Sequence, residues 1–316
     1  MKYIAGVDIG GTNTKIGILD EEGDIIIKKS IKTLSLDGVE KTMMRIWETI
    51  CELLREKNIN IDNLEGIGMG IPGPVKNQEI VGFFANFPWE KNLNIAEIFK
   101  NISGKITKVE NDVNVIALGE AKHGAGKGSK SSVTIALGTG IGGGICIEGK
   151  IISGFSGAGG EVGHMKLVKD GKLCGCGQRG CFEAYASATG IEREAISRLK
   201  VNKTNELYKK LNGQIDKLEA KDVFECAKEG DKFSLDIVEY ESEYLAMGIG
   251  NILNLINPEK IILSGGVSLA GDILLDRVKE KLPKYAMGVT LQDGFKIEIG
   301  ILEENAGIYG AAALIG

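Results

Sequence analysis

Apolar residues gather in short runs near the start of the chain and then recur at helical spacing. The segments Tyr3–Val7, Lys15–Leu19 and Ile25–Lys29 are apolar-rich and separated by turn residues, so they predict three strands. Over Val39–Lys57 the apolar residues recur every three or four positions, which predicts an amphipathic helix. The chain therefore opens with strand hairpins that are followed by a helix.

The rest of the chain alternates between strand-like and helix-like segments. The further strands predicted are Glu65–Ile71, Ile106–Val109, Ser132–Leu137, Gly142–Ile147, Lys150–Ser153, Lys260–Leu263 and Phe295–Ile299. The further helices predicted are Val113–His123, Phe233–Ile256, Gly271–Leu282 and Asn305–Leu314. This alternation is typical of α/β proteins.

The pattern of the first half restarts in the second half. At a constant offset of 127 residues, Gly11 and Thr12 match Gly138 and Thr139. Glycine is abundant and raises the number of chance matches, so the repeat alone is only suggestive. Two halves that each begin with hairpins nevertheless predict two α/β domains around a central cleft.

Length and composition agree with this organisation. A chain of 316 residues can form two domains, each with its own core. We place an N-terminal domain at 1–117, completed by a helix at about 305–316, and a C-terminal domain at 118–304. Hydrophobic residues make up 43% of the chain and charged residues 26%, as in a soluble globular protein.

Charge and hydropathy exclude some partners and locations. No apolar run approaches the roughly 20 residues that span a bilayer, so no membrane partner is expected. The net charge is −5 without a basic stripe, which argues against a nucleic-acid partner. The chain enters a strand at once, with nothing resembling a presequence, and we therefore expect a cytoplasmic protein.

The segment Glu161–Glu183 holds a dense group of metal-ligand residue types. It contains Cys174, Cys176, Cys181 and, ten residues before the first cysteine, His164. Three thiolates and an imidazole make a closed tetrahedral zinc site. One alternative is that the thiols are reduced and have no function, because zinc ligands are more often spaced C-x(2–4)-C than C-x-C. The other alternative is a disulfide, although two cysteines as close in sequence as Cys174 and Cys176 form one poorly.

Carboxylates stand on both sides of this metal-ligand group. Glu161 lies three residues before His164, and Glu183 lies two residues after Cys181. A zinc ion bound here would fix the orientation of His164 among these carboxylates. The pattern therefore predicts a binding site for a polar ligand that the metal ion holds in shape.

Two glycine-rich turns have the composition of phosphate-binding loops. Asp8–Lys15 reads DIGGTNTK and Leu137–Gly144 reads LGTGIGGG. A tight Gly-Gly turn exposes backbone N–H groups that can bind phosphate oxygens, although a plain β-hairpin explains either turn alone. Neither matches a Walker A loop or a dinucleotide-binding fingerprint. A third pair, Gly265-Gly266, ends a strand and could pass under an adenosine.

Two aspartates are candidates for roles in catalysis. Asp8 beside the first loop either hydrogen-bonds the turn or holds Mg²⁺ through water, since Mg²⁺ keeps much of its hydration shell. Asp112, in the segment Glu110–Asn114, is either a helix N-cap or a general base that accepts a hydroxyl proton. Asn111 would hydrogen-bond the same substrate. Local sequence does not separate these alternatives.

These motifs together resemble the ROK family of sugar kinases and regulators, within the actin/hexokinase-like (ribonuclease H-like) superfamily. The resemblance covers essentially the whole chain. It rests on DIGGTNTK, on E-N-D-x-N at Glu110–Asn114, on LGTGIGGG, on E-x-G-H at Glu161–His164, and on C-x-C-G-x-x-G-C-x-E at Cys174–Glu183.

The resemblance implies a role for each candidate residue. It implies a structural zinc held by His164, Cys174, Cys176 and Cys181. It implies a hexose bound by Pro72, Gly73, Asn86, Asn111, Asp112, Glu161, His164 and Glu183, with Asp112 as general base on the C6 hydroxyl. Pro72-Gly73 and Asn86–Trp89 would form the sugar-side wall, although simple core packing also explains Trp89. It implies Mg²⁺-ATP bound by Asp8, Gly10, Gly11, Thr12, Asn13, Lys15, Gly138, Thr139, Gly140, Gly265 and Gly266.

The resemblance also implies a substrate class and an assembly. E-x-G-H with the full cysteine motif is typical of glucokinases, and related kinases act on N-acetylmannosamine, N-acetylglucosamine, fructose or mannose. The family implies a homodimer. One alternative is a sugar-sensing protein of the same family that has no DNA-binding domain before Asp8. The other alternative is a zinc-ribbon interaction module.

Overall fold

The structure, a computed structural model, describes residues 1–84, 87–292 and 294–316. It divides into two compact units. Unit 1 comprises Met1–Thr134, Gly144–Gly160 and Ile301–Gly316, and unit 2 comprises Ile135–Gly143 and Glu161–Gly300. The domain boundary predicted after residue 117 falls inside a continuous helix, α3 (Asp112–His123), so unit 1 extends beyond it.

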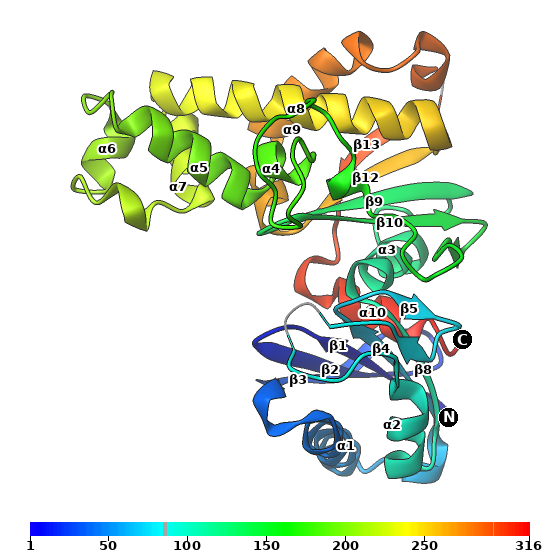
Figure 1. Ribbon diagram of the computed structural model, residues 1–316. Helices are drawn as coiled ribbons and strands as arrows, with labels where there is room; N and C mark the ends of the chain where they lie inside the picture. Colours follow the sequence, from blue (N-terminus) through cyan, green and yellow to red (C-terminus); the bar gives the residue numbers. More distant parts are fainter. Residues whose placement is uncertain (85–86, 293) are drawn as a thin grey trace. The chain divides into compact units, whose positions relative to one another are not determined.

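Unit 1 contains a five-stranded sheet in the order β3-β2-β1-β4-β8 (Figure 1). Its strands are β1 (Tyr3–Ile9), β2 (Asn13–Leu19), β3 (Ile25–Lys32), β4 (Leu64–Ile71) and β8 (Ile106–Asn111). The β1-β2 and β2-β3 pairs are antiparallel, whereas β4 runs parallel to both β1 and β8. The strands predicted in this region are confirmed, with small differences at their ends.

Helices cover both faces of this sheet (Figure 1). Helices α1 (Val39–Glu56) and α2 (Ile95–Ser103) pack on one face, and α3 and α10 (Ala306–Ala312) pack on the other. The central strand β4 is accordingly buried along nearly its whole length on both faces. Unit 1 also contains a three-stranded sheet of β5 (Val75–Lys76), β6 (Ile80–Val81) and β7 (Leu93–Asn94).

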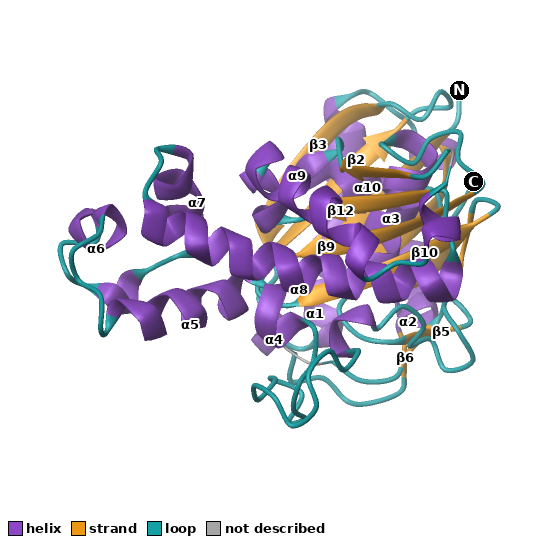
Figure 2. Ribbon diagram, turned by 90° about the horizontal axis from the view of Figure 1, so that it is seen from above, coloured by secondary structure: helices purple, strands orange, loops and turns teal. Residues whose placement is uncertain are grey.

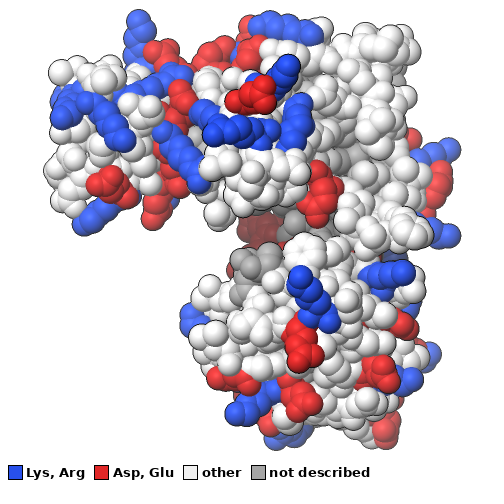
Figure 3. All heavy atoms as spheres, viewed as in Figure 1, with Lys and Arg blue, Asp and Glu red and all other residues white. Residues whose placement is uncertain are grey.

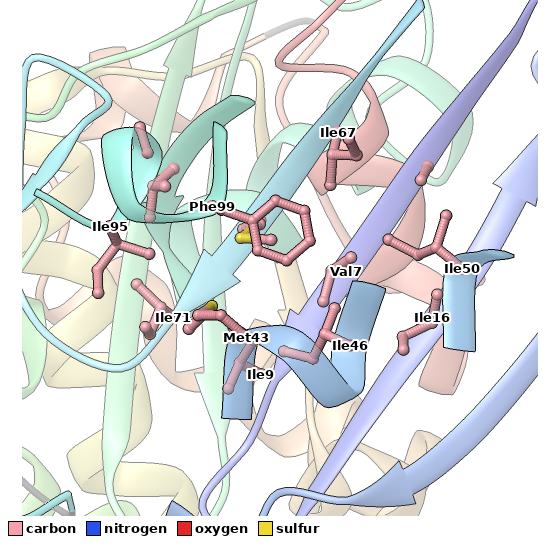
Figure 4. Close-up of a cluster of buried hydrophobic side chains, with 14 of the residues drawn as sticks. Val7, Ile9, Ile16, Met43, Ile46, Ile50, Ile67, Ile71, Ile95 and Phe99 are labelled. Carbon is pink, nitrogen blue, oxygen red and sulfur yellow. The ribbon is translucent and has the colours of Figure 1, made fainter. Parts of the chain in front are cut away.

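The main core of unit 1 lies between α1, α2 and the sheet (Figure 4). Met43, Ile46 and Ile50 of α1 point toward Val7 of β1 and toward Phe99 of α2, and all are buried. Burying a side chain of this size stabilises the fold by about 1.5–3 kcal/mol. The periodic apolar positions of the predicted helix Val39–Lys57 therefore form its buried face.

Backbone-to-backbone contact fixes α10 in unit 1. A Cβ atom on Gly68 of β4 would lie 1.7 Å from the carbonyl oxygen of Ala311 in α10. A Cβ on Gly310 of α10 would lie 1.6 Å from the carbonyl oxygen of Val115 in α3. Only glycine allows these approaches, so α10 is held against both the sheet and α3.

The second five-stranded sheet has the order β11-β10-β9-β12-β13. Its strands are β9 (Ser131–Leu137), β10 (Ile141–Ile147), β11 (Lys150–Ile151), β12 (Lys260–Ser264) and β13 (Lys296–Ile299). In both sheets the first strand of the half lies between its hairpin partner and a later strand. The sheets thus give a structural basis to the internal repeat at offset 127.

The helices of unit 2 gather around α8 (Lys232–Ile256), which contacts five other helices of the unit (Figure 2). These are α4 (Glu183–Ala186), α5 (Ala188–Leu199), α6 (Glu206–Lys210), α7 (Ala220–Lys228) and α9 (Asp272–Lys281). Within the described ranges, none of the helices has the length and apolar character needed to cross a bilayer. Figure 3 shows Lys and Arg side chains interspersed with Asp and Glu on the face in view.

A carboxylic acid is buried inside unit 2. Glu241 of α8 is fully buried, and among the described residues neither of its carboxyl oxygens has a hydrogen-bond partner. Burial raises the pKa of Glu241 well above its ordinary value. The unfolded chain ionises this group at an ordinary pH while the folded chain does not, so stability falls as pH rises above the unfolded-state pKa.

We predict that Glu241→Met stabilises the protein at pH 7 by about 1–3 kcal/mol, because it removes an unpaired buried polar group. The gain should shrink toward pH 4, where both the folded and unfolded states carry the protonated acid. Thermal unfolding at the two pH values measures the difference. Asp236→Asn, an exposed change on the same helix, is the control and should leave the unfolding temperature unchanged at both pH values. A destabilisation of equal size at both pH values would contradict this account.

Candidate active site and metal centre

The turn between β1 and β2 presents exposed backbone at residues 11–13. Gly10 N donates to Asn13 O over 3.0 Å, and Thr33 Oγ1 donates to Gly10 O over 2.7 Å. A Cβ on Gly11 would meet open space, so a ligand can approach the backbone there. The first predicted phosphate loop is thus a braced, accessible turn of the kind that binds anions.

Lys15 is tied to the segment that leads into α10. It lies opposite Asp8 in the β1-β2 pairing. Its Nζ donates to the carbonyl oxygen of Glu304 over 3.1 Å and lies 3.8 Å from a carboxylate oxygen of the same residue. The structure therefore gives Lys15 a structural partner, and its contact with nucleotide stays a prediction.

Two carboxylates influence each other in unit 1. Burial raises the pKa of Asp8 to about 6, the negative charge of Asp112 adds to the rise, and Lys15 opposes it. The backbone of α10 closes one side of Asp8, since a Cβ on Gly307 would lie 2.5 Å from its carboxyl carbon. A pair of acidic groups that repel each other is a suitable environment for a divalent cation.

The start of α3 separates the roles of two neighbouring residues. Asn111 is the N-cap, because its Oδ1 accepts from Val113 N over 2.9 Å and from Asn114 N over 3.1 Å. Asp112 is the first helical residue, and its Oδ1 also accepts from Val113 N, over 3.0 Å. Asn111 is therefore the N-cap of α3. The alternative that Asp112 is present as the N-cap is accordingly wrong.

A buried carboxylate that sequence reasoning missed holds this turn in place. Glu110 is 1% exposed and accepts hydrogen bonds from Asn111 N over 2.8 Å, Asn114 Nδ2 over 3.1 Å and Ser153 Oγ over 2.8 Å. It joins the start of α3 to the loop that precedes Glu161 in the sequence. The only local signal was its place directly before Asn111 and Asp112.

Pro72-Gly73 and Trp89, both predicted to belong to the sugar-side wall, make different contacts. Gly73 has a φ of 125° and its carbonyl accepts from Asn111 Nδ2 over 3.2 Å, so Pro72-Gly73 lies beside the start of α3. Asn86 lies outside the described residues. Trp89 donates from Nε1 to Ser35 O over 2.8 Å, and its ring centre lies 4.7 Å from that of Phe87.

Unit 2 brings the four predicted zinc ligands together. The ligand atoms of His164, Cys174, Cys176 and Cys181 all lie within 4.8 Å of one another. The Sγ atoms of Cys176 and Cys181 are 3.8 Å apart, and Cys174 Sγ is 3.8 Å from His164 Nδ1. Tetrahedral zinc with bonds of about 2.3 Å to sulfur requires sulfur atoms about 3.8 Å apart, so these side chains fit the ion.

The orientation of His164 separates its two ring nitrogens. Nδ1 faces Cys174, whereas Nε2 lies 3.8 Å from a carboxylate oxygen of Glu161. If Nδ1 holds the metal, Nε2 carries the proton and donates toward Glu161 and any ligand beside it.

Glu183 contacts two parts of the candidate site. Its Oε1 accepts from the Cys174 thiol over 2.8 Å and lies 3.8 Å from His164 Nδ1. Its Oε2 accepts from the backbone N–H of Ile141, over 3.3 Å. A Cβ on Gly140 would lie 2.6 Å from the same Oε2, so the second predicted phosphate loop passes directly over this carboxylate.

The cysteine loop is also docked on the helices of unit 2 without any metal. Lys172 Nζ lies 4.9 Å from the ring centre of Tyr240 and 5.2 Å from that of Tyr185. The same ammonium is 2.6 Å from a carboxylate oxygen of Glu194 in α5. Cation–π and ionic contacts therefore hold the loop against α5 and α8.

The second phosphate loop and the third glycine pair line one cavity of about 600 Å³. Gly138 and Thr139 form one wall, Gly266 and Val267 another, and Phe224 supplies an aromatic surface. Gly265 has a φ of 86° and lies against the backbone of Leu137, which explains the glycine there. The charged lining residues are Glu192, Glu219, Lys221, Glu225 and Lys228. A cavity of this size, lined by both apolar and charged residues, suits a nucleoside.

Comparison with known proteins places the chain in a family. The model of the ROK family matches residues 4–316. A glucokinase of Thermotoga maritima is 37% identical over 313 residues, which cover 99% of this chain and 96% of that protein. An N-acetyl-D-glucosamine kinase of Vibrio cholerae is 30% identical, over 98% of both proteins.

Solved structures give the same result. The ROK family glucokinase from Streptomyces griseus, in complex with glucose and AMPPNP, matches with a TM-score of 0.80 at 32% identity, over 99% of this chain and 98% of that one. A ROK hexokinase from Thermus thermophilus matches with a TM-score of 0.82 at 28% identity, covering 98% of this chain and 97% of that one. The chain belongs to the ROK family and has its two-domain α/β fold, which confirms the resemblance.

We predict that Asp8 titrates with a pKa of about 6 in metal-free protein. Asp112→Asn should lower this pKa because it removes a like charge, and Lys15→Met should raise it because it removes a nearby cation. NMR titration of protein labelled at aspartate carboxyl carbons reads the Asp8 signal directly, and Asp62→Asn, an exposed change, is the control. A wild-type Asp8 pKa near 4, unchanged by either variant, would show that the carboxylates do not interact.

Proposed function

We propose that this ROK-family sugar kinase transfers the γ-phosphoryl group of ATP to the C6 hydroxyl of a hexose, with glucose as the first candidate. The observation that carries the proposal is the position of Glu183. Its carboxylate contacts the metal-ligand group through Cys174 and the second phosphate loop through Ile141. A predicted sugar ligand and a predicted phosphate loop are therefore in direct contact within unit 2.

The proposed sugar ligands include polar side chains that can bind hydroxyl groups. These are Asn111, Asp112, Glu161, His164, Glu183 and Asn86, and Pro72 and Gly73 complete the proposed set. The orientation of His164 supports its role, since one ring nitrogen faces the cysteines and the other is turned toward Glu161. Buried groups that read several hydroxyls select between epimers, because a misplaced hydroxyl leaves one of them unpaired.

The nucleotide is bound by the glycine-rich segments. The proposed phosphate ligands are the turn residues Gly138, Thr139 and Gly140 of the second loop and Gly10, Gly11, Thr12 and Asn13 of the first, which offer backbone and side-chain donors. Gly265 and Gly266 pass beside the adenosine, and the cavity that Gly266 shares with the second loop supports this assignment. Asp8 holds hydrated Mg²⁺, which neutralises phosphate charge when bound.

A structural zinc ion would be held by His164, Cys174, Cys176 and Cys181. The spacing of these four ligand atoms supports the assignment. Such an ion supplies a fixed tetrahedral centre, and the chain uses it to fix the tautomer and direction of His164. The role of the ion is thus to position a sugar ligand.

Asp112 is the general base. Its carboxylate accepts the proton of the C6 hydroxyl as the new bond from that oxygen to the γ-phosphorus forms. The bond from the γ-phosphorus to the β,γ-bridging oxygen breaks in line, and ADP leaves with the electron pair. Asn111 holds the backbone N–H of Val113 and Glu110 holds that of Asn111, so the residues on either side of Asp112 are fixed in position.

The relatives support two sugars more than others. Glucokinases are 37% and 33% identical to this chain, and an N-acetyl-D-glucosamine kinase is 30% identical. Glucose is therefore our first candidate and N-acetylglucosamine our second. The expected homodimer, the cytoplasmic location and the lack of a nucleic-acid partner stay predictions.

We predict that ADP release with Mg²⁺-ATP will be fastest with glucose in a coupled assay. The panel includes glucose, mannose, fructose, N-acetylglucosamine and N-acetylmannosamine. Faster turnover with an N-acetylated sugar would keep the chemistry and change the substrate. Failure to turn over any of these sugars, in folded protein, would favour a sugar sensor over an enzyme.

We predict that Asp112→Asn lowers kcat by about 10²–10⁴, since the hydroxyl proton loses its acceptor. Sugar affinity should stay within about a few-fold, because the amide keeps the shape of the side chain. Steady-state kinetics and sugar binding measured by calorimetry separate the two quantities. Asp62→Asn serves as the control for an exposed aspartate. Near-normal turnover of the Asp112 variant would remove the residue from catalysis.

A further inference from the structure

A lysine outside the ligand set contacts one of the metal-ligand cysteines. Lys166 and Cys181 face each other in an isolated antiparallel β-bridge. On either side of it, Phe182 N donates to Met165 O and Leu167 N donates to Gly180 O, both over 2.9 Å. Side chains of directly opposed residues lie on the same face of such a pair. The backbone therefore aims the Lys166 side chain at the Cys181 sulfur.

The contact itself is a short hydrogen bond. Lys166 Nζ lies 2.7 Å from Cys181 Sγ, within hydrogen-bond distance, and Cys181 is fully buried. In the described part of the chain, no carboxylate forms an ion pair with Lys166. The ammonium is thus directed at a sulfur atom and not at one of the acidic residues close by.

The charge of the metal centre explains what this ammonium does. Zinc carries two positive charges and three cysteine thiolates carry three negative charges, so the proposed centre has a net charge of −1 (2 − 3) with neutral His164. Glu161 and Glu183 stand beside the same histidine and make the surroundings more negative. One ammonium on Cys181 brings the centre to neutrality and withdraws electron density from that sulfur.

We propose that Lys166 is a positioning residue for the zinc centre, which it stabilises by offsetting the negative charge on Cys181. This inference rests on the proposed zinc site. Lys166 lies at the protein surface while Cys181 is buried, so the contact also covers the metal-ligand sulfur on its solvent side. Loss of the ammonium leaves excess negative charge on the ligands and makes release of the ion easier.

The test measures zinc release from the full chain. Purified protein is mixed with an excess of a chromophoric zinc chelator, and the first-order release rate is recorded. Lys166→Met keeps the length of the side chain and removes its charge, and it should release zinc about 10–100-fold faster. Lys166→Arg keeps the charge and should stay near the wild-type rate. Lys169→Met, at an exposed lysine of the same loop, is the matched control and should release zinc at the wild-type rate.

Each result decides between explanations. Release from Lys166→Met within twofold of wild type overturns the inference, and so does equally fast release from Lys166→Met and Lys166→Arg. Circular dichroism of each variant shows whether faster release reflects general unfolding, which would also overturn it. Wild-type protein that contains no zinc by metal analysis overturns the zinc assignment itself. Sugar turnover, measured on the same sample, tests the kinase proposal independently of zinc release.

Discussion

The closest packing in unit 1 joins three segments that are far apart in the sequence. Strand β4 meets α10 at Gly68, and α10 meets α3 at Gly310, in both cases with backbone against backbone. Any side chain at these glycines would force the segments apart. Because α3 begins with Asp112 and α10 closes over Asp8, this packing also sets the surroundings of the two acidic groups to which we assign chemistry.

Unit 2 secures the candidate site residues that it carries in a different way. The cysteine loop has little regular structure, so its shape depends on side chains and, in our proposal, on a metal ion. Lys172 anchors the loop to α5 and α8 through aromatic rings and Glu194, and Lys166 contacts a metal-ligand sulfur. Charged side chains thus hold the loop from two sides, whereas unit 1 relies on close backbone packing.

Much of the fold could be predicted from the sequence because its signals are local. Alternating apolar runs and turn residues identified the hairpins, and helical periodicity identified α1, α3 and α8. Helix α2 was missed although Asn94 caps it and Gly104 ends it, since its nine residues form a short pattern. Helices α6 and α7 were missed because they are short. Helix α5 was missed because charged residues interrupt its apolar positions.

The candidate site was less predictable where distant segments meet. The density of cysteines and histidine identified the metal ligands, because all four lie within one short segment. The contacts of Glu110 with Ser153, and of Lys15 with Glu304, join residues 43 and 289 positions apart and leave no local signal. Asn111 and Asp112 are both good N-cap residues, so only the structure assigns the cap to Asn111.

The two tryptophans of the chain occupy unlike surroundings. Trp47 packs edge-on against Phe99 in the core of unit 1, with ring centres 6.3 Å apart. Trp89 sits in the loop to which we assign part of the sugar wall and is tied by its indole N–H to Ser35. The protein therefore carries its own optical probe: in a Trp47→Phe variant, Trp89 is the one remaining tryptophan and its fluorescence reports on that loop.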